Sequence, residues 1–314
     1  MNESKVAIIG AGGVGATIAY ATLISGTARE VALYDIDAAK VHAEVLDLNH
    51  GLRFAPTTRV IGSDDLEVCL DADVVVVTAG AKQRPGETRL DLAGRNTEIF
   101  RRLIPEVTQL APDSVLLLVT NPVDVLTQVA LELSGLPATR VIGSGTVLDT
   151  SRLHFLLANH CGVAVANVHA NIAGEHGDSE FALWSSASIG TVPLDRWEKP
   201  DGTTLTAEER ADIADRVRHA AYEIIQGKGA TTYAIGLAVN SILEAILNDE
   251  HRILPVSTLQ QGTHGISDVC LSMPVVVGAG GVVRWMELPL TGEEQRQLNS
   301  SADTIRRTVR SVGF

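Results

Sequence analysis

The sequence has little positive charge, few cysteines and no long apolar run. It carries 25 Lys and Arg against 38 Asp and Glu, which gives a net charge of −13. This balance argues against a nucleic-acid-binding surface, because a phosphate backbone would be repelled rather than neutralised. It also disfavours docking on an anionic membrane. Any anionic substrate must therefore be bound by local cations that act against the field of the whole chain.

The three cysteines, Cys69, Cys161 and Cys270, are far apart and lack the spacing of metal ligands. Their odd number and apolar surroundings favour buried free thiols in a reducing compartment. No secretion signal precedes the first apolar run, which starts at Val6, and no apolar run reaches the roughly 18 residues that span a bilayer. We therefore expect a cytoplasmic protein without a metal site.

A regular alternation of strands and helices fills the first half of the chain. Short apolar runs are typical of buried parallel strands, and helical segments separate them here. The pattern predicts an α/β fold: a doubly wound parallel sheet of the Rossmann type over residues 1–145, followed by an α+β substrate domain over residues 146–314. Strands are expected near residues 5–9, 31–35, 60–61, 73–78, 115–120 and 141–142, with helices near 16–25, 38–49, 90–111, 123–133 and 146–158.

A glycine motif joins the first strand to the first helix. Gly10, Gly12 and Gly15 have the spacing G-x-G-x-x-G, and the second strand ends at Asp35. In this pattern the first glycine allows a tight turn, the second lets the backbone approach a pyrophosphate, and the third lets helix and strand pack closely. An ordinary strand–turn–helix is the alternative. The second strand and its terminal acid also fall in place, however, so we predict a dinucleotide site with phosphates at the helix N-terminus.

Asp35 indicates which dinucleotide binds. Its carboxylate can accept hydrogen bonds from both ribose hydroxyls, and Asp37 follows nearby. A 2′-phosphate would meet these carboxylates and no arginine. The cofactor is therefore expected to be NAD rather than NADP.

Two further segments are expected at the carboxyl ends of the strands, where ligands bind. Asn121 precedes Pro122, which disfavours a helix, so its amide should project toward the crevice, although a plain turn asparagine is the alternative. Residues 81–90 carry three cations and a Pro-Gly pair between a strand and a long helix. Such a loop is usually just solvated; the alternative is a lid that brings Gln83 and Arg89 onto the substrate.

The second half contains candidate reacting groups. His176 lies between Gly174 and Gly177, so no bulky neighbour shields an imidazole that can exchange a proton near neutral pH. Alone this signal is weak, because most of the nine histidines should be surface or core residues. Asp149 and Arg152 share one face of an apolar helix, and a surface ion pair is the alternative. We expect Arg152 to bind a substrate carboxylate through its bidentate fork, and Asp149 to orient His176 and stabilise its protonated form.

The remaining segments carry less information. Thr231 precedes an apolar helix and is either a polar group that lines the pocket or the N-cap of that helix. Residues 251–257, 269–277 and 282–286 are predicted to be antiparallel strands, and an amphipathic helix is predicted from Thr291 onward.

Taken together and in this order, the motifs resemble those of the lactate/malate dehydrogenase family, most closely its bacterial lactate-forming members. The resemblance covers essentially the whole chain. The motifs that carry it are Gly10-x-Gly12-x-x-Gly15, residues 81–90, Thr120-Asn-Pro-Val-Asp124, Leu148-Asp-Thr-Ser-Arg152 and Gly174-Glu-His-Gly-Asp178.

The resemblance implies reversible NADH-dependent reduction of pyruvate to L-lactate, the last step of anaerobic glycolysis. In such an enzyme His176 would be the acid/base, Asp149 its orienting carboxylate, Arg152 the carboxylate-binding arginine and Arg89 the group that polarises the carbonyl. Further substrate contacts would come from Gln83, Asn121, Asp124 and Thr231. Contacts with NAD would come from Gly10, Gly12, Val14, Gly15, Asp35, Lys40, Gly80, Ala81, Val119, Asn121 and Ser144.

Gln83 bears on the substrate. The malate branch of the family places an arginine there to pair with a second carboxylate, whereas a neutral glutamine leaves room for a methyl group. Pyruvate is therefore favoured. A malate or other 2-hydroxyacid dehydrogenase is the alternative enzyme, and a catalytically silent NAD-binding protein is the alternative of another class.

The resemblance also bears on regulation. Bacterial members are commonly tetramers and are often activated by fructose 1,6-bisphosphate, which an arginine and a histidine bind across a subunit interface. His169 matches that histidine, but His154 stands where the family has the arginine. Because a neutral imidazole holds phosphate poorly, activation is expected to be weak, pH-dependent or absent.

Overall fold

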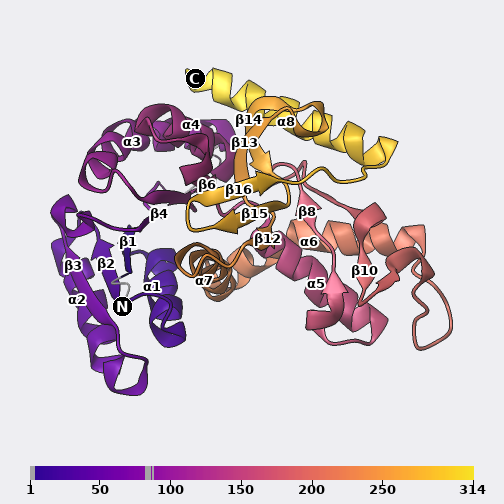
Figure 1. Ribbon diagram of the computed structural model, residues 1–314, viewed down its shortest axis with the longest axis horizontal. Coiled ribbons are helices and arrows are strands. Elements are labelled where there is room, and N and C mark those ends of the chain that lie inside the picture. Colours follow the sequence, from indigo (N-terminus) through magenta and orange to yellow (C-terminus); the bar gives the residue numbers. More distant parts are fainter. Residues whose placement is uncertain (1–3, 82–85, 87) are drawn as a thin grey trace.

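An eight-stranded sheet forms the centre of the fold in a computed structural model that describes residues 4–81, 86 and 88–314. Its strands are β1 (Lys5–Ile9), β2 (Glu30–Tyr34), β3 (Arg59–Ser63), β4 (Val74–Val77), β5 (Val115–Leu118), β6 (Val141–Gly143), β13 (Ser257–Gln261) and β14 (Ser267–Ser272). They lie in the order β14-β13-β6-β5-β4-β1-β2-β3 (Figure 1). The strands from β6 to β3 are parallel, whereas β13 runs antiparallel to both β6 and β14.

Helices cover both faces of this sheet, as the sequence pattern predicts. Val74 and Val76 of β4 join one apolar cluster with α1 (Gly13–Ser25) and α7 (Tyr233–Leu247), while Val75 and Val77 join a second cluster with α3 (Arg89–Leu110) and α4 (Val123–Ser134). Burying each such valine stabilises the fold by roughly 1.5–3 kcal/mol, which explains the uninterrupted apolar run. The covering helices are α1 (Gly13–Ser25), α2 (Ala38–Gly51), α3 (Arg89–Leu110), α4 (Val123–Ser134) and α7 (Tyr233–Leu247).

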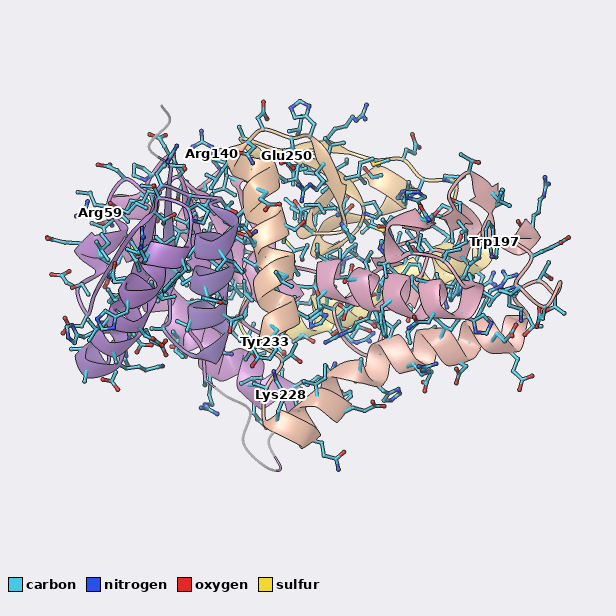
Figure 2. The ribbon with its side chains drawn as sticks, turned by 90° about the horizontal axis from the view of Figure 1, so that it is seen from below. Arg59, Arg140, Trp197, Lys228, Tyr233 and Glu250 are labelled. Atoms are coloured by element: carbon cyan, nitrogen blue, oxygen red, sulfur yellow. The ribbon has the colours of Figure 1, made fainter. Side chains whose placement is uncertain are left out.

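Three further long helices belong to the second half of the chain. These are α5 (Val147–Cys161), α6 (Ala207–Lys228) and α8 (Gly292–Ser311). The amphipathic α8, yellow in Figure 1, buries Leu298, Ile305 and Val309 in one cluster with residues of β14 and α4. Figure 2 shows α6 as a long helix with Lys228 near its C-terminal end, where the ammonium lies 3.9 Å from the ring centre of Tyr233.

Small sheets and short helices complete the second half. The antiparallel sheets consist of β7 (Val168–His169), β10 (Ser188–Ile189) and β11 (Val192–Pro193); of β12 (Arg252–Leu254), β15 (Val275–Gly278) and β16 (Gly281–Trp285); and of β8 (Ile172–Ala173) with β9 (Phe181–Ala182). Short 3₁₀ helices cover residues 52–54, 66–69, 138–140, 165–167, 184–186, 194–196 and 263–265. The pattern of this half is therefore α+β, as predicted.

Two predicted strands were wrong in their extent. Residues 269–277 do not form one strand, because β14 ends at Ser272, β15 begins at Val275, and the two belong to different sheets. Pro274 between them has no N–H to donate, so it breaks the ladder. The predicted strand over residues 251–257 is likewise divided, into β12 and the first residue of β13, with Pro255 between them.

The state of the three cysteines agrees with the expectation from the sequence. Cys69, Cys161 and Cys270 are free and buried within the described part of the chain. Burial raises the pKa of the Cys69 thiol to about 11, so this sulfur stays protonated and packs as an apolar group. Across residues 4–81, 86 and 88–314, no helix has both the length and the apolar character needed to cross a membrane.

Candidate active site

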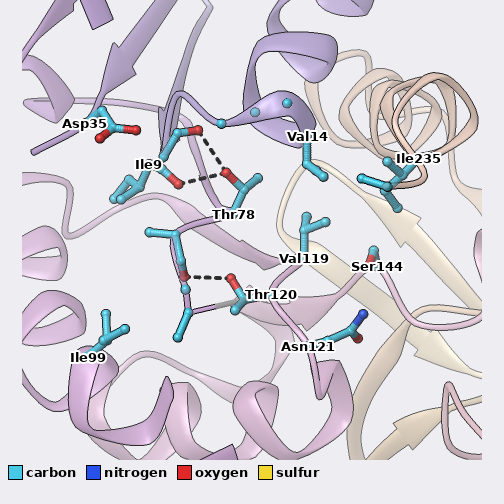
Figure 3. Close-up of a pocket in the computed structure, with 18 of the residues that line it drawn as sticks. Ile9, Val14, Asp35, Thr78, Ile99, Val119, Thr120, Asn121, Ser144 and Ile235 are labelled. Atoms are coloured by element: carbon cyan, nitrogen blue, oxygen red, sulfur yellow. Dashed lines mark hydrogen bonds between the residues drawn. The ribbon is translucent and has the colours of Figure 1, made fainter. Parts of the chain in front are cut away.

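The loop between β1 and α1 leaves an uncapped helix end facing open space. Gly10 has a φ of +103°, and a Cβ on Gly15 would lie 1.9 Å from the Gly10 carbonyl oxygen, so no side chain fits at Gly15. The Thr78 hydroxyl donates to the Gly10 carbonyl across 2.9 Å and holds the turn (Figure 3). Gly12 precedes α1 without a side-chain cap, so the first N–H groups of the helix are placed to bind an anion such as a pyrophosphate.

Asp35 is fixed at the end of β2 beside this loop. Its carboxylate accepts hydrogen bonds from the backbone N–H groups of Ala11, at 2.8 Å, and Asp37, at 3.1 Å, and Lys40 lies 3.3 Å away. Burial opposes ionisation, but these backbone donors and Lys40 outweigh it and lower the pKa of Asp35. The side chain is therefore an ionised acceptor, suited to ribose hydroxyls and unfavourable to a 2′-phosphate.

A cavity of about 1530 Å³ extends from this loop into the second half of the chain. Figure 3 shows Asp35 at one side and Asn121 with Ser144 at the other, with Val14 and Val119 between them. The cofactor contacts predicted from the sequence all line this cavity: Gly10, Gly12, Val14, Gly15, Asp35, Lys40, Gly80, Ala81, Val119, Asn121 and Ser144. The glycine loop, the uncapped helix end and Asp35 together fit an NAD molecule.

The cavity wall also carries an imidazole and a guanidinium that share one carboxylate. Nδ1 of His176 lies 2.6 Å from Oδ2 of Asp149, and Nη1 of Arg152 donates to Oδ1 of Asp149 across 2.7 Å. Asp149 is buried in the first turn of α5, whereas His176 and Arg152 both reach the cavity wall. Because Nδ1 is engaged, Nε2 of His176 is the nitrogen left to exchange a proton with a ligand.

The electrostatics of this pair favour the imidazolium. Burial disfavours charge on His176, but the Asp149 carboxylate more than compensates and raises the pKa of His176 to about 9. Asp149 itself stays ionised: its burial is outweighed by His176 and Arg152, which lower its pKa. At neutral pH the site therefore holds a proton ready for donation next to a cation that can bind a carboxylate.

Asp124 lies behind the loop of residues 174–178, which carries His176, and is not among the residues that line the cavity. One carboxylate oxygen accepts the backbone N–H of His176 at 2.7 Å, and the other accepts the Ser272 hydroxyl at 3.3 Å. Burial raises the pKa of Asp124 to about 6, and the donors that surround it limit the rise. These contacts hold the backbone of His176 in place, and the substrate contact expected of Asp124 from the sequence stays a prediction.

Arg89, the first residue of α3, lies at the rim of the site. Its Nη2 donates to Oδ1 of Asp178 at 3.0 Å and to the Tyr222 hydroxyl at 2.8 Å. A Cβ on Gly177 would lie 2.8 Å from Nη1 of Arg89, so the guanidinium packs against the residue that follows His176. The structure thus brings the predicted lid arginine next to the loop of residues 174–178, although Arg89 is not among the residues that line the cavity.

Thr231 lines the cavity, as one of the two alternatives predicts. The other alternative was wrong, because the N-cap of α7 is Thr232. The Thr231 hydroxyl is buried and has no hydrogen-bond partner among the described residues. A buried hydroxyl without a partner is costly, so this oxygen is suited to a ligand contact.

Three further residues were singled out from the sequence: Gln83, His154 and His169. Gln83 falls outside the described residues, so its contact with substrate stays a prediction. His154 is partly buried on α5 with Nε2 2.7 Å from the Ala170 carbonyl, and His169 is exposed on β7. Burial lowers the pKa of His154, and His169 lowers it further, so His154 is neutral at pH 7.

Several groups at the site were not predicted from the sequence. Tyr222 on α6 contacts Arg89 from 133 positions further along the chain, and no local pattern signals that pairing. Leu148 and Ile235 supply apolar wall, and their helical spacing only indicates burial. Glu180, four positions after His176, is buried beside the catalytic pair.

Comparisons with known proteins agree with this geometry. Residues 4–143 match the family model for the lactate/malate dehydrogenase NAD binding domain, and residues 146–312 match the model for the alpha/beta C-terminal domain of the same family. The chain is 53% identical to an L-lactate dehydrogenase of Bifidobacterium animalis subsp. lactis, over 100% of this chain and 98% of that protein. It is 51% identical to an L-lactate dehydrogenase of a Synechococcus species, over 98% and 99% of the two chains.

Solved structures show the same similarity. A lactate dehydrogenase from a Medee basin deep-sea metagenome library superposes with a TM-score of 0.94 at 43% identity, over 100% of both chains. The minor L-lactate dehydrogenase of Enterococcus mundtii superposes with a TM-score of 0.95 at 39% identity, over 99% of both chains. The similarity therefore extends over both halves of the fold and over the site between them.

Proposed function

The chain belongs to the lactate/malate dehydrogenase family, and we propose that it is an NAD-dependent L-lactate dehydrogenase. It reduces pyruvate to L-lactate with NADH, and oxidises L-lactate with NAD in the reverse direction. One observation carries the proposal: His176 and Arg152 share the Asp149 carboxylate on the wall of the cavity that also contains the glycine loop. The names of the relatives described above support the lactate branch of the family.

Different residues of this chain bind the cofactor, bind the substrate, polarise the ketone and donate the proton. The glycine loop and Asp35 bind NADH first, and bound NADH supplies the hydride. Arg152 binds the pyruvate carboxylate with the N–H groups not engaged by Asp149. Arg89 polarises the ketone as negative charge develops on its oxygen. The imidazolium of His176 donates its Nε2 proton to that oxygen, and Asp149 stabilises the charged ring before transfer.

The direction of proton transfer sets the pH preference. Pyruvate reduction needs the imidazolium, and the Asp149 carboxylate keeps His176 protonated up to a pKa of about 9. Reduction is therefore favoured at neutral and acidic pH. Lactate oxidation needs the neutral ring and is favoured as the pH rises through that value.

The choice of pyruvate rests on Gln83 and on the relatives. A neutral side chain at this position gives a second substrate carboxylate no partner, in a chain whose net charge already repels dianions. The test is NADH oxidation with pyruvate, oxaloacetate and 2-ketoisocaproate, compared by kcat/KM. Pyruvate should give the highest value. A higher value for oxaloacetate would identify a malate dehydrogenase, and NADH binding without oxidation by any keto acid would identify a silent binding protein.

Fructose 1,6-bisphosphate should activate this enzyme weakly at neutral pH. Burial lowers the pKa of His154, which stands at the position of the family arginine, so His154 contributes no charge to a phosphate there. The bisphosphate should therefore lower the KM for pyruvate little at pH 7.5. His154→Arg should increase the effect, because it restores a permanent cation. A large drop in KM for the unmodified enzyme at that pH would contradict the proposal.

We further propose a homotetramer in the cytoplasm with a cofactor domain over residues 1–145 and a substrate domain over residues 146–314. Three buried free thiols suit a reducing compartment. The sheet crosses the proposed domain boundary, because β13 of the second half pairs with β6. Light scattering of the purified enzyme gives the subunit number directly.

A further inference from the structure

Glu180 is a buried acid beside the catalytic groups that the mechanism above does not use. Only 6% of the residue is exposed, and its Oε1 has no hydrogen-bond partner among the described residues. One oxygen of Glu180, one oxygen of Asp149 and one imidazole nitrogen of His176 lie within 4.8 Å of one another. The site therefore places two carboxyl groups next to one imidazole.

The charges that face Glu180 come from three parts of the fold. Asp149 and Arg152 approach from α5, His176 from the turn after β8, and Arg218 from α6. Burial raises the pKa of Glu180 to about 8, the Asp149 carboxylate raises it as well, and the three cations oppose the rise. Glu180 is therefore a neutral acid at pH 7 that ionises in mildly alkaline solution.

Asp149, His176 and Glu180 also have the ligand types of a metal site, but the arrangement does not suit a cation. Both Asp149 oxygens already accept hydrogen bonds, one from Arg152 and one from His176. A metal ion would have to displace Arg152 and compete with the imidazolium proton. Proton binding is what this cluster favours.

We propose that Glu180 sets the charge of the substrate site: the site binds an anionic keto acid only while Glu180 is neutral, and ionisation of Glu180 releases that anion. This inference rests on the proposed function. With Glu180 neutral, His176 and Arg152 outweigh Asp149, and the site attracts a carboxylate. With Glu180 ionised, the Glu180 and Asp149 carboxylates offset the charges of His176 and Arg152, the two of these three cations that line the cavity, and the attraction is lost.

Binding and protonation are then linked. An anion that binds only the neutral form draws a proton onto Glu180 in alkaline solution. His176 takes up a proton in the same range, so the two groups titrate as a pair. At a pH of about 9 the enzyme should take up more than one proton per anion bound. A site governed by His176 alone could take up no more than one.

The experiment measures proton uptake when oxamate, an unreactive analogue of pyruvate, binds the enzyme saturated with NADH near pH 9. An indicator dye in weakly buffered solution gives the readout. Glu180→Gln keeps the shape of the side chain but cannot ionise, so it should take up about one proton fewer per oxamate. Its KM for pyruvate should also rise less steeply with pH. Glu223→Gln, which removes an exposed carboxyl on α6, should behave like the unmodified enzyme. Equal uptake by the E180Q variant and the unmodified enzyme overturns the inference.

If the E180Q variant no longer unfolds cooperatively on heating, a second variant tests the inference. Arg218→Gln removes a cation that favours ionised Glu180, so the alkaline rise in KM should move to higher pH; an unmoved profile overturns the inference. The proposed function has its own separate outcome. If the unmodified enzyme neither binds oxamate nor reduces pyruvate, that function fails; if it does both while E180Q titrates identically, only the role of Glu180 fails.

Discussion

Oδ2 of Asp149 lies 2.6 Å from Nδ1 of His176, and the carboxylate is almost completely buried. A buried ion pair is costly to assemble and is costly to break by removing one partner. Here the second carboxylate oxygen is engaged by Arg152, so one acid fixes both the proton donor and the anion-binding group. Removing its charge should therefore change proton transfer more than cofactor binding.

Asp149→Asn tests this dependence. The amide does not favour the imidazolium, so the pKa of His176 should fall from about 9 toward its ordinary value. Because pyruvate reduction needs the protonated ring, the alkaline decline of kcat/KM should move to lower pH. At pH 7.5 the value should fall by about two decades or more. Steady-state kinetics between pH 5.5 and 9.5 give the profile, and an unmoved decline would show that another group donates the proton.

Arg152→Lys should weaken substrate binding while leaving the cofactor site intact. An ammonium keeps the charge but loses the planar fork that binds a carboxylate. The KM for pyruvate should rise roughly 10- to 100-fold, the range expected for losing a hydrogen bond between charged groups. NADH affinity, measured by fluorescence, is the control, since the glycine loop and Asp35, not Arg152, are expected to bind the cofactor. Unchanged KM would place the substrate carboxylate elsewhere.

Asp35→Ser should relax the preference for NADH over NADPH. The pKa of Asp35 is lowered by backbone donors and Lys40, so its charge repels a 2′-phosphate at every working pH. Removing the charge should narrow the ratio of kcat/KM values for the two cofactors by about tenfold or more. Asp37→Ser is the matched control, because serine can still cap α2. If both variants changed the preference equally, the preference would depend on the total negative charge near the site and not on Asp35 itself.

Gly15→Ala should destabilise the fold and abolish NADH binding. The added Cβ would lie 1.9 Å from the Gly10 carbonyl oxygen, so β1 and α1 must move apart. Overpacking of this kind costs about 1–3 kcal/mol or more, which urea unfolding resolves. Gly227→Ala on α6 is the control, because nothing lies within 4 Å of its Cβ. It should be neutral or stabilising by up to about 1 kcal/mol. Similar losses in both variants would contradict the packing argument.

The cofactor half could be predicted from the sequence because its determinants are local. Gly10, Gly15 and Asp35 lie within one strand–helix–strand unit, and the motif fixes their relative positions. Arg152 could be placed beside Asp149 because residues three apart share a helix face. The pairing of His176 with Asp149 joins separate segments, and it was expected from the chemistry of the two groups and from the family resemblance.

Other features depend on contacts that no local pattern encodes. The sequence around Asp124 does not determine whether its side chain points into the cavity or away from it. Only the fold shows that the carboxylate accepts the backbone N–H of His176. Tyr222 meets Arg89 because α6 passes the start of α3. The break between β14 and β15 could have been predicted, because Pro274 lacks an N–H and is visible in the sequence. The prediction of one strand gave more weight to the apolar residues on either side of it.

β13 comes from the later half of the chain, yet it pairs with β6 of the earlier half, with Ser257 opposite Gly143. Severing the polypeptide near residue 145 would therefore not release two self-sufficient pieces. The amino-terminal fragment would present β6 as a bare edge, and the carboxy-terminal fragment would present β13 in the same way. Such edges recruit strands from other molecules. Each fragment produced singly should precipitate, and the two produced together should recombine and remain in solution.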